Sequence, residues 1–422
     1  MARVLLGFAA VCLCASVARA DDALTLDQAI HLALSRNERA AIAELQQVQA
    51  DAAVDRAHVA FLPVLNASGN DTVHPIDDAP KNTASGQLTL TQPLIVMTAF
   101  PLLAQAKHNL EAQRAQTVED KRQLSFDVAK AYFAVLLAQE VVAAAQKKLD
   151  TAAADVADTQ AQFKAQLVSS NDVTRARISL STSVRELSQD RSQLATAFLD
   201  LGFIINAPAP TVLAAPTPLL EAGKQTPPAP ETLVNQSLAA RPDLLARKGS
   251  ALAAHDFARE PRYRYFPTLA LVGQLTANSN VGMNGHELDG SVALTAQWSI
   301  YDGGARTADA RSRDAAAEIA DLETKQLIRS IDNDVRTASS QLVAAQQALA
   351  AAADAVTAGR KSADETAILY HQGLAKAIEL VDANEQRFQA EVSFAEAEFS
   401  VASAYLALRQ ALGQGPLEEA RK

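Results

Sequence analysis

The chain contains an internal duplication, in which motifs of the first half return in the second half at a nearly constant offset. Phe61-Leu62-Pro63 returns as Tyr265-Phe266-Pro267, which is 204 residues later, and Asp127-Val128 returns as Asp334-Val335, which is 207 residues later. Short differences in loop length produce a drift of this size, because insertions are tolerated mainly in loops. Whatever unit the first half forms, the second half is therefore expected to form again.

Each copy is predicted to contain a helix, two strands, a long helix, a turn and a second helix. The first helix begins with a capping box, in which Thr25 is followed three residues later by Gln28, and it can continue to about residue 60. Seven prolines fall between residues 206 and 230. They predict an extended crossover without regular helix, because proline lacks the backbone donor that a helix needs. The predicted units are a signal peptide at 1–20, a first repeat at 21–205, the crossover at 206–230, a second repeat at 231–415 and a tail at 416–422.

The long helices carry the clearest periodic signal. Apolar or small side chains recur at alternating spacings of three and four residues, from Leu124 to Phe163 and again from Ile328 to Val356. This period of about 3.5 residues is typical of a left-handed coiled coil, and the alanines in it allow helices to approach closely. A helix over about 101–166 would be roughly 100 Å long at about 1.5 Å per residue, far longer than the helices of a compact domain.

The extended segments have the length of membrane-spanning β-strands. Strands of about ten residues are predicted at 64–72, 86–95, 268–277 and 291–301. Four strands cannot close a transmembrane barrel, since the smallest barrels use about eight and each unpaired backbone group in lipid costs several kcal/mol. We therefore expect several copies of the chain to share one barrel.

Residues 1–20 are predicted to be a cleaved secretory signal. Arg3 precedes an apolar stretch, and Ala18-Arg19-Ala20 fits the small-x-small cleavage pattern. Both cysteines, Cys12 and Cys14, leave with it, so the mature chain can form neither a disulfide nor a thiolate metal site. Lipidation of Cys14 is the less favoured interpretation, because Leu13 stands where a lipoprotein signal carries a small residue. No run of about 18 apolar residues is found after residue 20, so membrane entry is expected through β-strands.

Charge and motif content argue against several classes of function. Acidic residues outnumber basic ones by 48 to 38, for a net charge of −10, whereas nucleic-acid binding needs a concentrated basic face. The seven histidines show no metal-ligand spacing, and neither a phosphate-binding glycine loop nor a nucleophile elbow is present. We therefore predict no catalytic, cofactor-binding or metal site, and no enzymatic activity.

Aromatic residues gather at the ends of the predicted strands. The functional interpretation is an aromatic girdle at a membrane interface, and the alternative is ordinary packing at the corner where strands meet helices. The girdle candidates are Phe61, Tyr265, Phe266, Trp298 and Tyr301.

Several motifs carry a family resemblance. The segment from Thr25 to Asn37 resembles the N-terminal helix motif of the TolC-type outer-membrane efflux proteins, and the segment from Ser237 to Leu244 resembles its second-copy counterpart. Tyr301-Asp302-Gly303-Gly304 looks like the strand-to-helix corner of that family, and Tyr370-His371-Gln372-Gly373-Leu374 is similar to the turn at its periplasmic tip. The resemblance covers essentially the whole mature chain, in order.

The resemblance implies a mainly α fold with membrane β-structure. Three copies would form a twelve-stranded β-barrel in the outer membrane, continued by a twelve-helix coiled-coil tube across the periplasm. Members of the family are passive exit ducts of tripartite efflux or type I secretion systems. The implied partners are two further copies of the chain, a periplasmic adaptor (membrane fusion protein), an inner-membrane pump and outer-membrane lipid, with no cofactor and no nucleic acid.

The resemblance also implies residues that act at the periplasmic entrance. Glu379 and Asp382 fall where the family places acidic rings, and three chains would bring six carboxylates together into a cation-selective constriction. Asp172 and Tyr370 occupy positions whose contact resembles the latch of the closed entrance, a carboxylate–phenol hydrogen bond worth about 1–3 kcal/mol. The alternatives are a solvated helix cap for the acidic pair, an N-cap for Asp172 and seam packing for Tyr370.

The two copies differ at the implied turns and corners. Gly373 is the turn residue of the second hairpin, whereas Gln166 stands at that place in the first. Asp302, Gly303 and Gly304 form the second corner, but the first copy has Val96-Met97-Thr98-Ala99 there. These departures concern the first corner and the first tip, and leave the architecture intact.

Two other classes of protein compete with the exit duct. A periplasmic coiled-coil scaffold or adaptor would carry one helical hairpin between short-stranded domains, whereas two hairpins are predicted here. A single-chain porin would show many more alternating strands. The sequence does not indicate the cargo, which could be a drug, a metal ion, a metabolite or a polypeptide.

Overall fold

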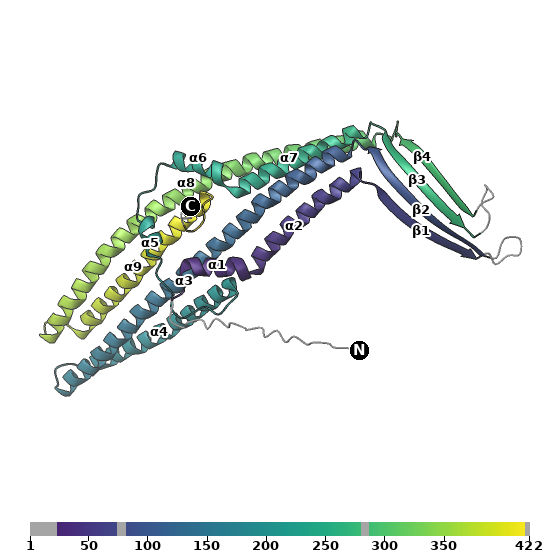
Figure 1. Cartoon of the computed structure of the whole chain (residues 1–422). Coiled ribbons are helices and arrows are strands. Elements are labelled where there is room, and N and C mark those ends of the chain that lie inside the picture. Colours follow the sequence, from purple (N-terminus) through teal and green to yellow (C-terminus); the bar gives the residue numbers. More distant parts are fainter. Residues whose placement is uncertain (1–22, 74–81, 280–286, 418–422) are drawn as a thin grey trace, which may run out of the picture.

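The computed structural model describes residues 23–73, 82–279 and 287–417. The signal peptide, both cysteines and the polar loops predicted between the strands of each pair lie wholly or partly outside these residues. The described chain is mainly helical and elongated, with one antiparallel sheet at one end (Figure 1). Its strands are β1 (Val64–Val73), β2 (Asn82–Ile95), β3 (Thr268–Asn278) and β4 (Leu288–Gln297).

The helices occur in the same order in each half of the chain. The first half contains α1 (Leu26–Arg36), α2 (Glu38–His58), the short 3₁₀ helix η1 (Val59–Phe61), α3 (Ala99–Lys164) and α4 (Ser170–Ile205). The second half contains α6 (Pro230–Ala240), α7 (Pro242–Tyr263), α8 (Ala305–His371) and α9 (Ala377–Ala411), and α5 (Thr217–Gly223) lies between the halves. At 66 and 67 residues, α3 and α8 are each about 100 Å long.

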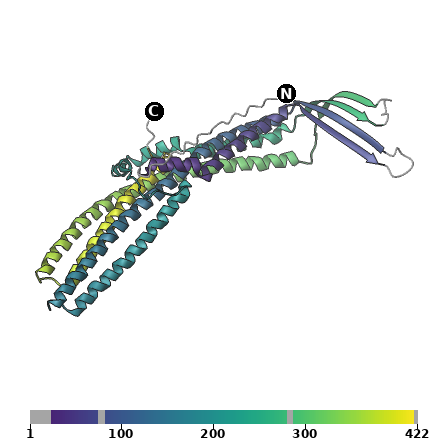
Figure 2. The same cartoon turned by 60° about the horizontal axis from the view of Figure 1, so that its bottom comes forward.

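The duplication places the two halves side by side. The strand order is β1-β2-β3-β4, so the central pair β2–β3 joins the two repeats. Next to the sheet, the helices pack in the order α2-α3-α7-α8. Farther from the sheet the order is α4-α3-α9-α8, and Figure 2 shows these two hairpins running together away from the sheet.

Three expectations about the elements need correction. The first helix does not continue to residue 60, because Asn37 adopts an extended conformation and its side chain caps α2 at the backbone N–H of Arg39. Strand β4 ends at Gln297 and not at residue 301, because its partner β3 begins at Thr268, which is paired with Gln297. The crossover contains helix α5, since a proline in the first turn of a helix removes no intrahelical hydrogen bond.

Helix α3 bears on the expectation that no membrane-spanning helix follows residue 20. It contains an 18-residue window with a mean hydropathy of 1.5, so by length and composition alone it could cross a membrane. However, α3 packs against α1, α2, α4, α7 and α9 along its length. Its apolar stretch therefore serves as the central core helix of the chain.

The apolar core lies in the middle of the molecule, where the two repeats meet. We call this region, which contains the clusters around Tyr132 and Ile331, the waist. One cluster joins α1, α3, α4 and the end of α9 around Phe126 and Tyr132, and a second joins α6, α8 and α9 around Ile331 and Leu342. The buried hydroxyl of Tyr132 lies 2.6 Å from the carbonyl oxygens of both Leu24 and Ala214. Tyr132 thereby ties the N-terminal segment and the crossover to the core.

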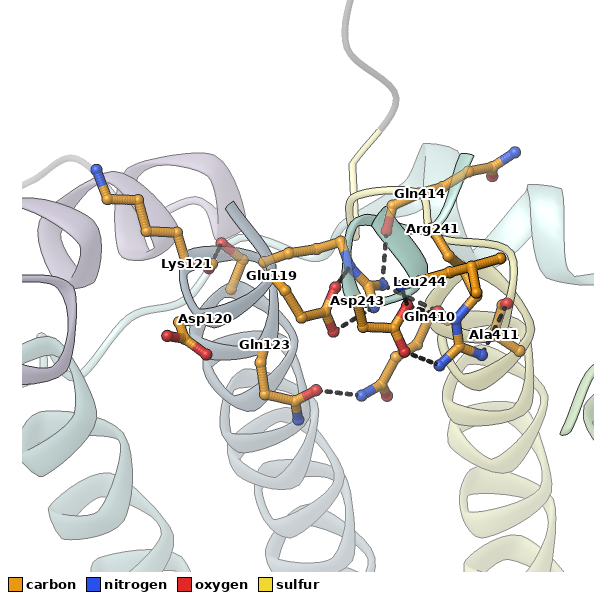
Figure 3. A network of polar contacts seen from close by, with 12 residues as sticks. Glu119, Asp120, Lys121, Gln123, Arg241, Asp243, Leu244, Gln410, Ala411 and Gln414 are labelled. Carbon is orange, nitrogen blue, oxygen red and sulfur yellow. Dashed lines mark hydrogen bonds and ion pairs between the residues drawn. The ribbon is translucent and has the colours of Figure 1, made fainter. Parts of the chain in front are cut away.

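A polar network crosses the waist beside the core (Figure 3). The guanidinium of Arg122 in α3 binds the Glu119 carboxylate through two hydrogen bonds of 2.8 and 2.7 Å and donates to the carbonyl of Gln410 in α9. The guanidinium of Arg241 binds Asp243 in α7 at 3.0 and 2.6 Å. Arg241 also donates to the carbonyl of Ala411 at 3.5 Å, so the network ties the end of α9 both to α3 of the first repeat and to the start of α7.

Candidate functional site

The middle of the sheet has one apolar face and one polar face. There, four successive rows of side chains across the strands alternate between the two faces, whereas the next row toward the helices, Val64, Thr91, Val272 and Ala293, places three apolar side chains on the polar face. The apolar rows are Leu65, Leu90, Gly273, Val292 and Ala67, Leu88, Leu275, Gly290. The polar rows that alternate with them are Asn66, Thr89, Gln274, Ser291 and Ser68, Gln87, Thr276, Asp289. Such a sheet can separate hydrocarbon on one side from water on the other.

The girdle candidates all lie at the helical end of the sheet. Phe61 ends η1, Tyr265 and Phe266 lie between α7 and β3, and Trp298 and Tyr301 follow β4. All except Phe61 are exposed. The indole N–H of Trp298 donates to the backbone carbonyl of Tyr265 at 3.0 Å. The segment after β4 is therefore hydrogen-bonded to the segment before β3.

The second corner is held by a carboxylate and a buried guanidinium. Gly303 and Gly304 have φ values of +70° and +91°, which favour glycine, and the Asp302 carboxylate accepts hydrogen bonds from the backbone of Gly304 and Arg306 at the start of α8. The Arg306 guanidinium is buried, binds Asp302 and donates to the carbonyls of Arg264 and Ile300.

Arg306 is a residue that the sequence analysis missed. Its guanidinium also lies over the Tyr265 ring, 4.3 Å from the ring centre. At the corresponding place in the first repeat Phe100 packs against Phe61, with 5.2 Å between ring centres. The signal that could have found Arg306 is its spacing from Asp302, because residues four apart at a helix start can form an ion pair.

The hairpin turns at the far end use left-handed residues. Gln166 has φ +63° and Gly373 has φ +76°. The backbone N–H of Leu167 donates to the carbonyl of Gln162, and that of Leu374 donates to the carbonyl of Leu369, so the two turns close in the same way. A glutamine thus adopts the conformation for which the second repeat uses glycine.

The two acidic entrance candidates lie in the first two turns of α9. Glu379 accepts a hydrogen bond of 3.1 Å from the backbone N–H of Lys376 and so caps the start of α9, while its side chain stays exposed. Asp382 is exposed one turn farther along. Both carboxylates are therefore available at the tip, and Glu379 also has a local structural role.

The expected latch is not formed within the chain. The Asp172 carboxylate turns back to the N-cap of its own helix, where it binds the backbone N–H and the hydroxyl of Ser169 at 3.0 and 2.8 Å. The buried Tyr370 hydroxyl lies 3.5 Å from the hydroxyl of Thr159 in α3. Within one copy of the chain the two side chains thus have separate partners, and the Ser-x-x-Asp pattern of the capping box was the sequence signal for the contact that Asp172 makes.

A series of polar contacts between the two hairpins was also missed from the sequence. Below the waist, Lys148, Thr151 and Asp155 lie on one face of α3 and contact α9. The Asp155 carboxylate accepts a 3.2 Å hydrogen bond from the Asn384 amide. Burial raises the pKa of Asp155 above its ordinary value, although the Asn384 hydrogen bond acts in the opposite direction. The signal available in the sequence was that charged and hydroxyl side chains occur among the apolar positions of α3, which indicates polar partners on a neighbouring helix.

Metal binding finds no support in the described residues. In residues 23–73, 82–279 and 287–417, no group of three or more histidine, cysteine, aspartate or glutamate side chains is arranged to hold a metal ion.

Solved structures of similar fold are known. The chain superposes on the structure of CusC, described as forming a transmembrane channel, with a TM-score of 0.81, 18% identity and coverage of 92% of each chain. It superposes on the open state of the MtrE outer membrane channel of Neisseria gonorrhoeae with a TM-score of 0.80, 20% identity and coverage of 94% of this chain and 91% of that one. At these identities the likeness establishes the fold.

The sequence comparisons establish the family. The chain is 22% identical over 369 residues to the outer membrane protein TolC of Vibrio cholerae, covering 86% of this chain and 84% of that protein. It is 24% identical over 315 residues to the outer membrane efflux protein BepC of Brucella suis, covering 74% and 68%. A family model for outer membrane efflux proteins matches residues 29–207 and 233–414, so the resemblance seen in the sequence is confirmed. The chain therefore belongs to the outer membrane efflux protein family, whose members are efflux channels of the outer membrane.

Proposed function

We propose that this chain is one third of an outer-membrane exit duct, which passively conducts cargo received from an inner-membrane pump through a periplasmic adaptor. Three copies would form a twelve-stranded barrel continued by a helical tube. The observation that carries the proposal is the two-faced sheet, because its apolar rows suit lipid and its polar rows suit a water-filled channel.

The open edges of the sheet support the assembly of several copies. In the part of the chain that the structure describes, β1 pairs only with β2 and β4 pairs only with β3. Unpaired backbone groups in hydrocarbon cost several kcal/mol each, so a single copy would be unstable in a bilayer. Pairing of β1 in one copy with β4 in the next would remove both edges.

Exposed apolar side chains on the outer helices support the same closure. On α2, the exposed fractions of Ile42 and Leu45 are 52% and 66%, and on α8 those of Ile319 and Leu322 are both 56%. Leu45 lies 13 residues before the end of α2, and Ile319 lies 14 residues after the start of α8. Both therefore lie about 20 Å from the sheet-side end of their helix at 1.5 Å per residue, where α2 of one copy would meet α8 of the next.

Disulfide cross-linking tests the assembly directly, because the mature chain is expected to lack cysteine. The Leu45→Cys/Ile319→Cys double variant should give a covalent trimer on a non-reducing gel of outer membranes, whereas each single variant should stay monomeric. A double variant that migrates only as a monomer, or protein recovered only in the soluble periplasmic fraction, would contradict the ring and favour the scaffold alternative.

Ion selectivity tests the entrance. The wild-type protein should form channels in planar bilayers that prefer cations, and Asp382→Asn should reduce that preference, since Asp382 is exposed at the tip and has no capping role. Glu379→Gln should reduce it as well, with an added loss of helix stability from the cap. If the Glu379→Gln/Asp382→Asn double variant had the same reversal potential as the wild type, the proposed acidic ring would be contradicted.

A further inference from the structure

Lys148 occupies an unusual place between the two helical hairpins. It lies on α3, and its side chain is only 10% exposed. Its ammonium group lies 2.7 Å from a carboxylate oxygen of Glu186 in α4 and 2.6 Å from one of Glu385 in α9. The same ammonium lies 4.5 Å from the centre of the Phe388 ring, also in α9. The Lys148 side chain thus connects three helices, its own helix α3 and helices α4 and α9.

The Lys148–Glu385 contact joins the two helical hairpins on the tip side of the apolar core. Helices α3 and α4 form one hairpin, and α8 and α9 form the other. Within the described residues, Lys148–Glu385 is the one ion pair that connects these two hairpins. Nearer the tip, hydrogen bonds join Thr151 to Arg387 at 3.4 Å and Asp155 to Asn384 at 3.2 Å, and the hydroxyls of Thr159 and Tyr370 lie 3.5 Å apart.

The electrostatics favour a charged, persistent contact. Burial alone would lower the pKa of Lys148, but the hydrogen bonds and charges of Glu186 and Glu385 outweigh it, and the pKa lies above its ordinary value. Because the ammonium is largely shielded from water, salt screens these pairs less than it screens surface pairs. The cation–π contact with Phe388 acts in the same direction.

We propose that Lys148 is the positioning residue that holds hairpin α8–α9 against hairpin α3–α4, and that the hairpins must separate at Lys148 before the tip can widen. This inference rests on the proposed function as an exit duct. Lys148 lies 16 residues before the end of α3, about 24 Å from the tip at 1.5 Å per residue, so among the described residues only neutral-donor or long hydrogen bonds and packing remain between it and the tip to hold the hairpins together once the ion pair is lost. Neither Lys148 nor its partners belong to the predicted entrance residues.

Distance measurements between spin labels test the inference without depending on conduction. Leu167 and Leu374 are exposed at the two hairpin turns and can be replaced by labelled cysteines in the full-length protein. Lys148→Met, which keeps the packing on Phe388 but removes the charge, should lengthen or broaden the distance between the labels. Lys147→Met, an exposed neighbour on the same helix, should leave it unchanged, and Lys148→Arg should restore it.

Conductance in planar bilayers is the second readout. Lys148→Met should raise the open-to-closed ratio about fivefold or more, as the loss of a coupling contact does. Glu385→Gln should shift it in the same direction and covers the case in which Lys148→Met folds poorly. Label distances and conductance equal to those of the wild type in Lys148→Met and Glu385→Gln would overturn the role of Lys148 while leaving a conducting duct intact. A wild-type protein that forms no channel would instead refute the proposed function, and the label distances would still decide the role of Lys148.

Discussion

Replacement of Tyr132 by phenylalanine should release the N-terminal segment from the waist. The Tyr132 hydroxyl shares its single hydrogen between the carbonyls of Leu24 and Ala214, each 2.6 Å away. Burial raises the pKa of this hydroxyl to about 12, although the hydrogen bond to Ala214 acts in the opposite direction. The group is therefore a neutral donor at any physiological pH.

The magnitude follows from the two carbonyls that would lose their donor. The carbonyl of Leu24 also accepts the backbone N–H of Ala214 at 3.0 Å, so it keeps one partner, whereas Ala214 loses its contact with Tyr132. Leaving a buried acceptor without its donor costs about 1–3 kcal/mol. The side chain keeps its ring and its packing, so we expect little further loss.

Hydrogen–deuterium exchange gives the most direct measurement. The backbone N–H of Leu24 donates to Val212, and that of Ala214 donates to Leu24. In Tyr132→Phe both should exchange about 10- to 100-fold faster, since about 1.4 kcal/mol corresponds to a factor of ten. The Tyr405→Phe variant is a suitable control, because within the described residues the Tyr405 hydroxyl accepts one hydrogen bond, a long one of 3.4 Å from Arg409. Unchanged exchange of the segments around residues 24 and 214 in Tyr132→Phe would refute the reasoning.

Three further predictions concern the waist and the second corner. Gly413→Ala should lower the melting temperature, because Gly413 has φ +76° and an added Cβ would lie 2.9 Å from the Cα of Arg241, so the cost should exceed about 1 kcal/mol. Arg306→Lys should destabilise the corner against heat and protease by about 2–3 kcal/mol, since an ammonium cannot replace the forked contacts to two carbonyls and a carboxylate. Burial would raise the pKa of Asp243, but the Arg241 guanidinium lowers it overall, so its stabilising contribution is complete at neutral pH and is lost as the pH falls below about 4. Asp243→Asn should therefore reduce thermal stability at pH 7 more than at pH 3.

Matched controls separate these effects from general damage. Gly415→Ala should be nearly neutral, because an added Cβ there would lie 3.6 Å from its nearest neighbour, at ordinary contact distance. Arg311→Lys changes an exposed residue of the same helix as Arg306 and should leave the corner intact. If Gly413→Ala melts with the wild type, or if Asp243→Asn loses equal stability at both pH values, the corresponding argument fails.

The two corners illustrate the limit of arguing from a repeat. The duplication correctly indicated that Phe61 and Tyr265 occupy equivalent places, because their neighbouring motifs align. It did not indicate that Tyr265 lies under the Arg306 guanidinium while Phe61 packs against Phe100, because the side chain opposite each ring comes from a separate helix. Equivalent positions in the two repeats thus make different side-chain contacts.

The hairpin tips show the same limit. The turns at Gln166 and Gly373 were inferred from the family's motif, and both residues have positive φ. The partners of Asp172 and Tyr370 depend on which way each side chain turns, and a carboxylate three residues into a helix can bind its own N-cap at little cost in chain entropy.

The sequence by itself determined the repeated order of elements, the two long helices and four strands of nearly the observed extent, because hydrophobic period and proline position are local properties of the chain. Tertiary structure decided which chemistry is brought together. The Lys148 contact unites α3, α4 and α9 from residues as far apart as 148 and 385, and the rows of the sheet unite β1 with β4. Charge pairs and strand registers of this kind depend on the packing of distant segments, and no local pattern encodes that packing.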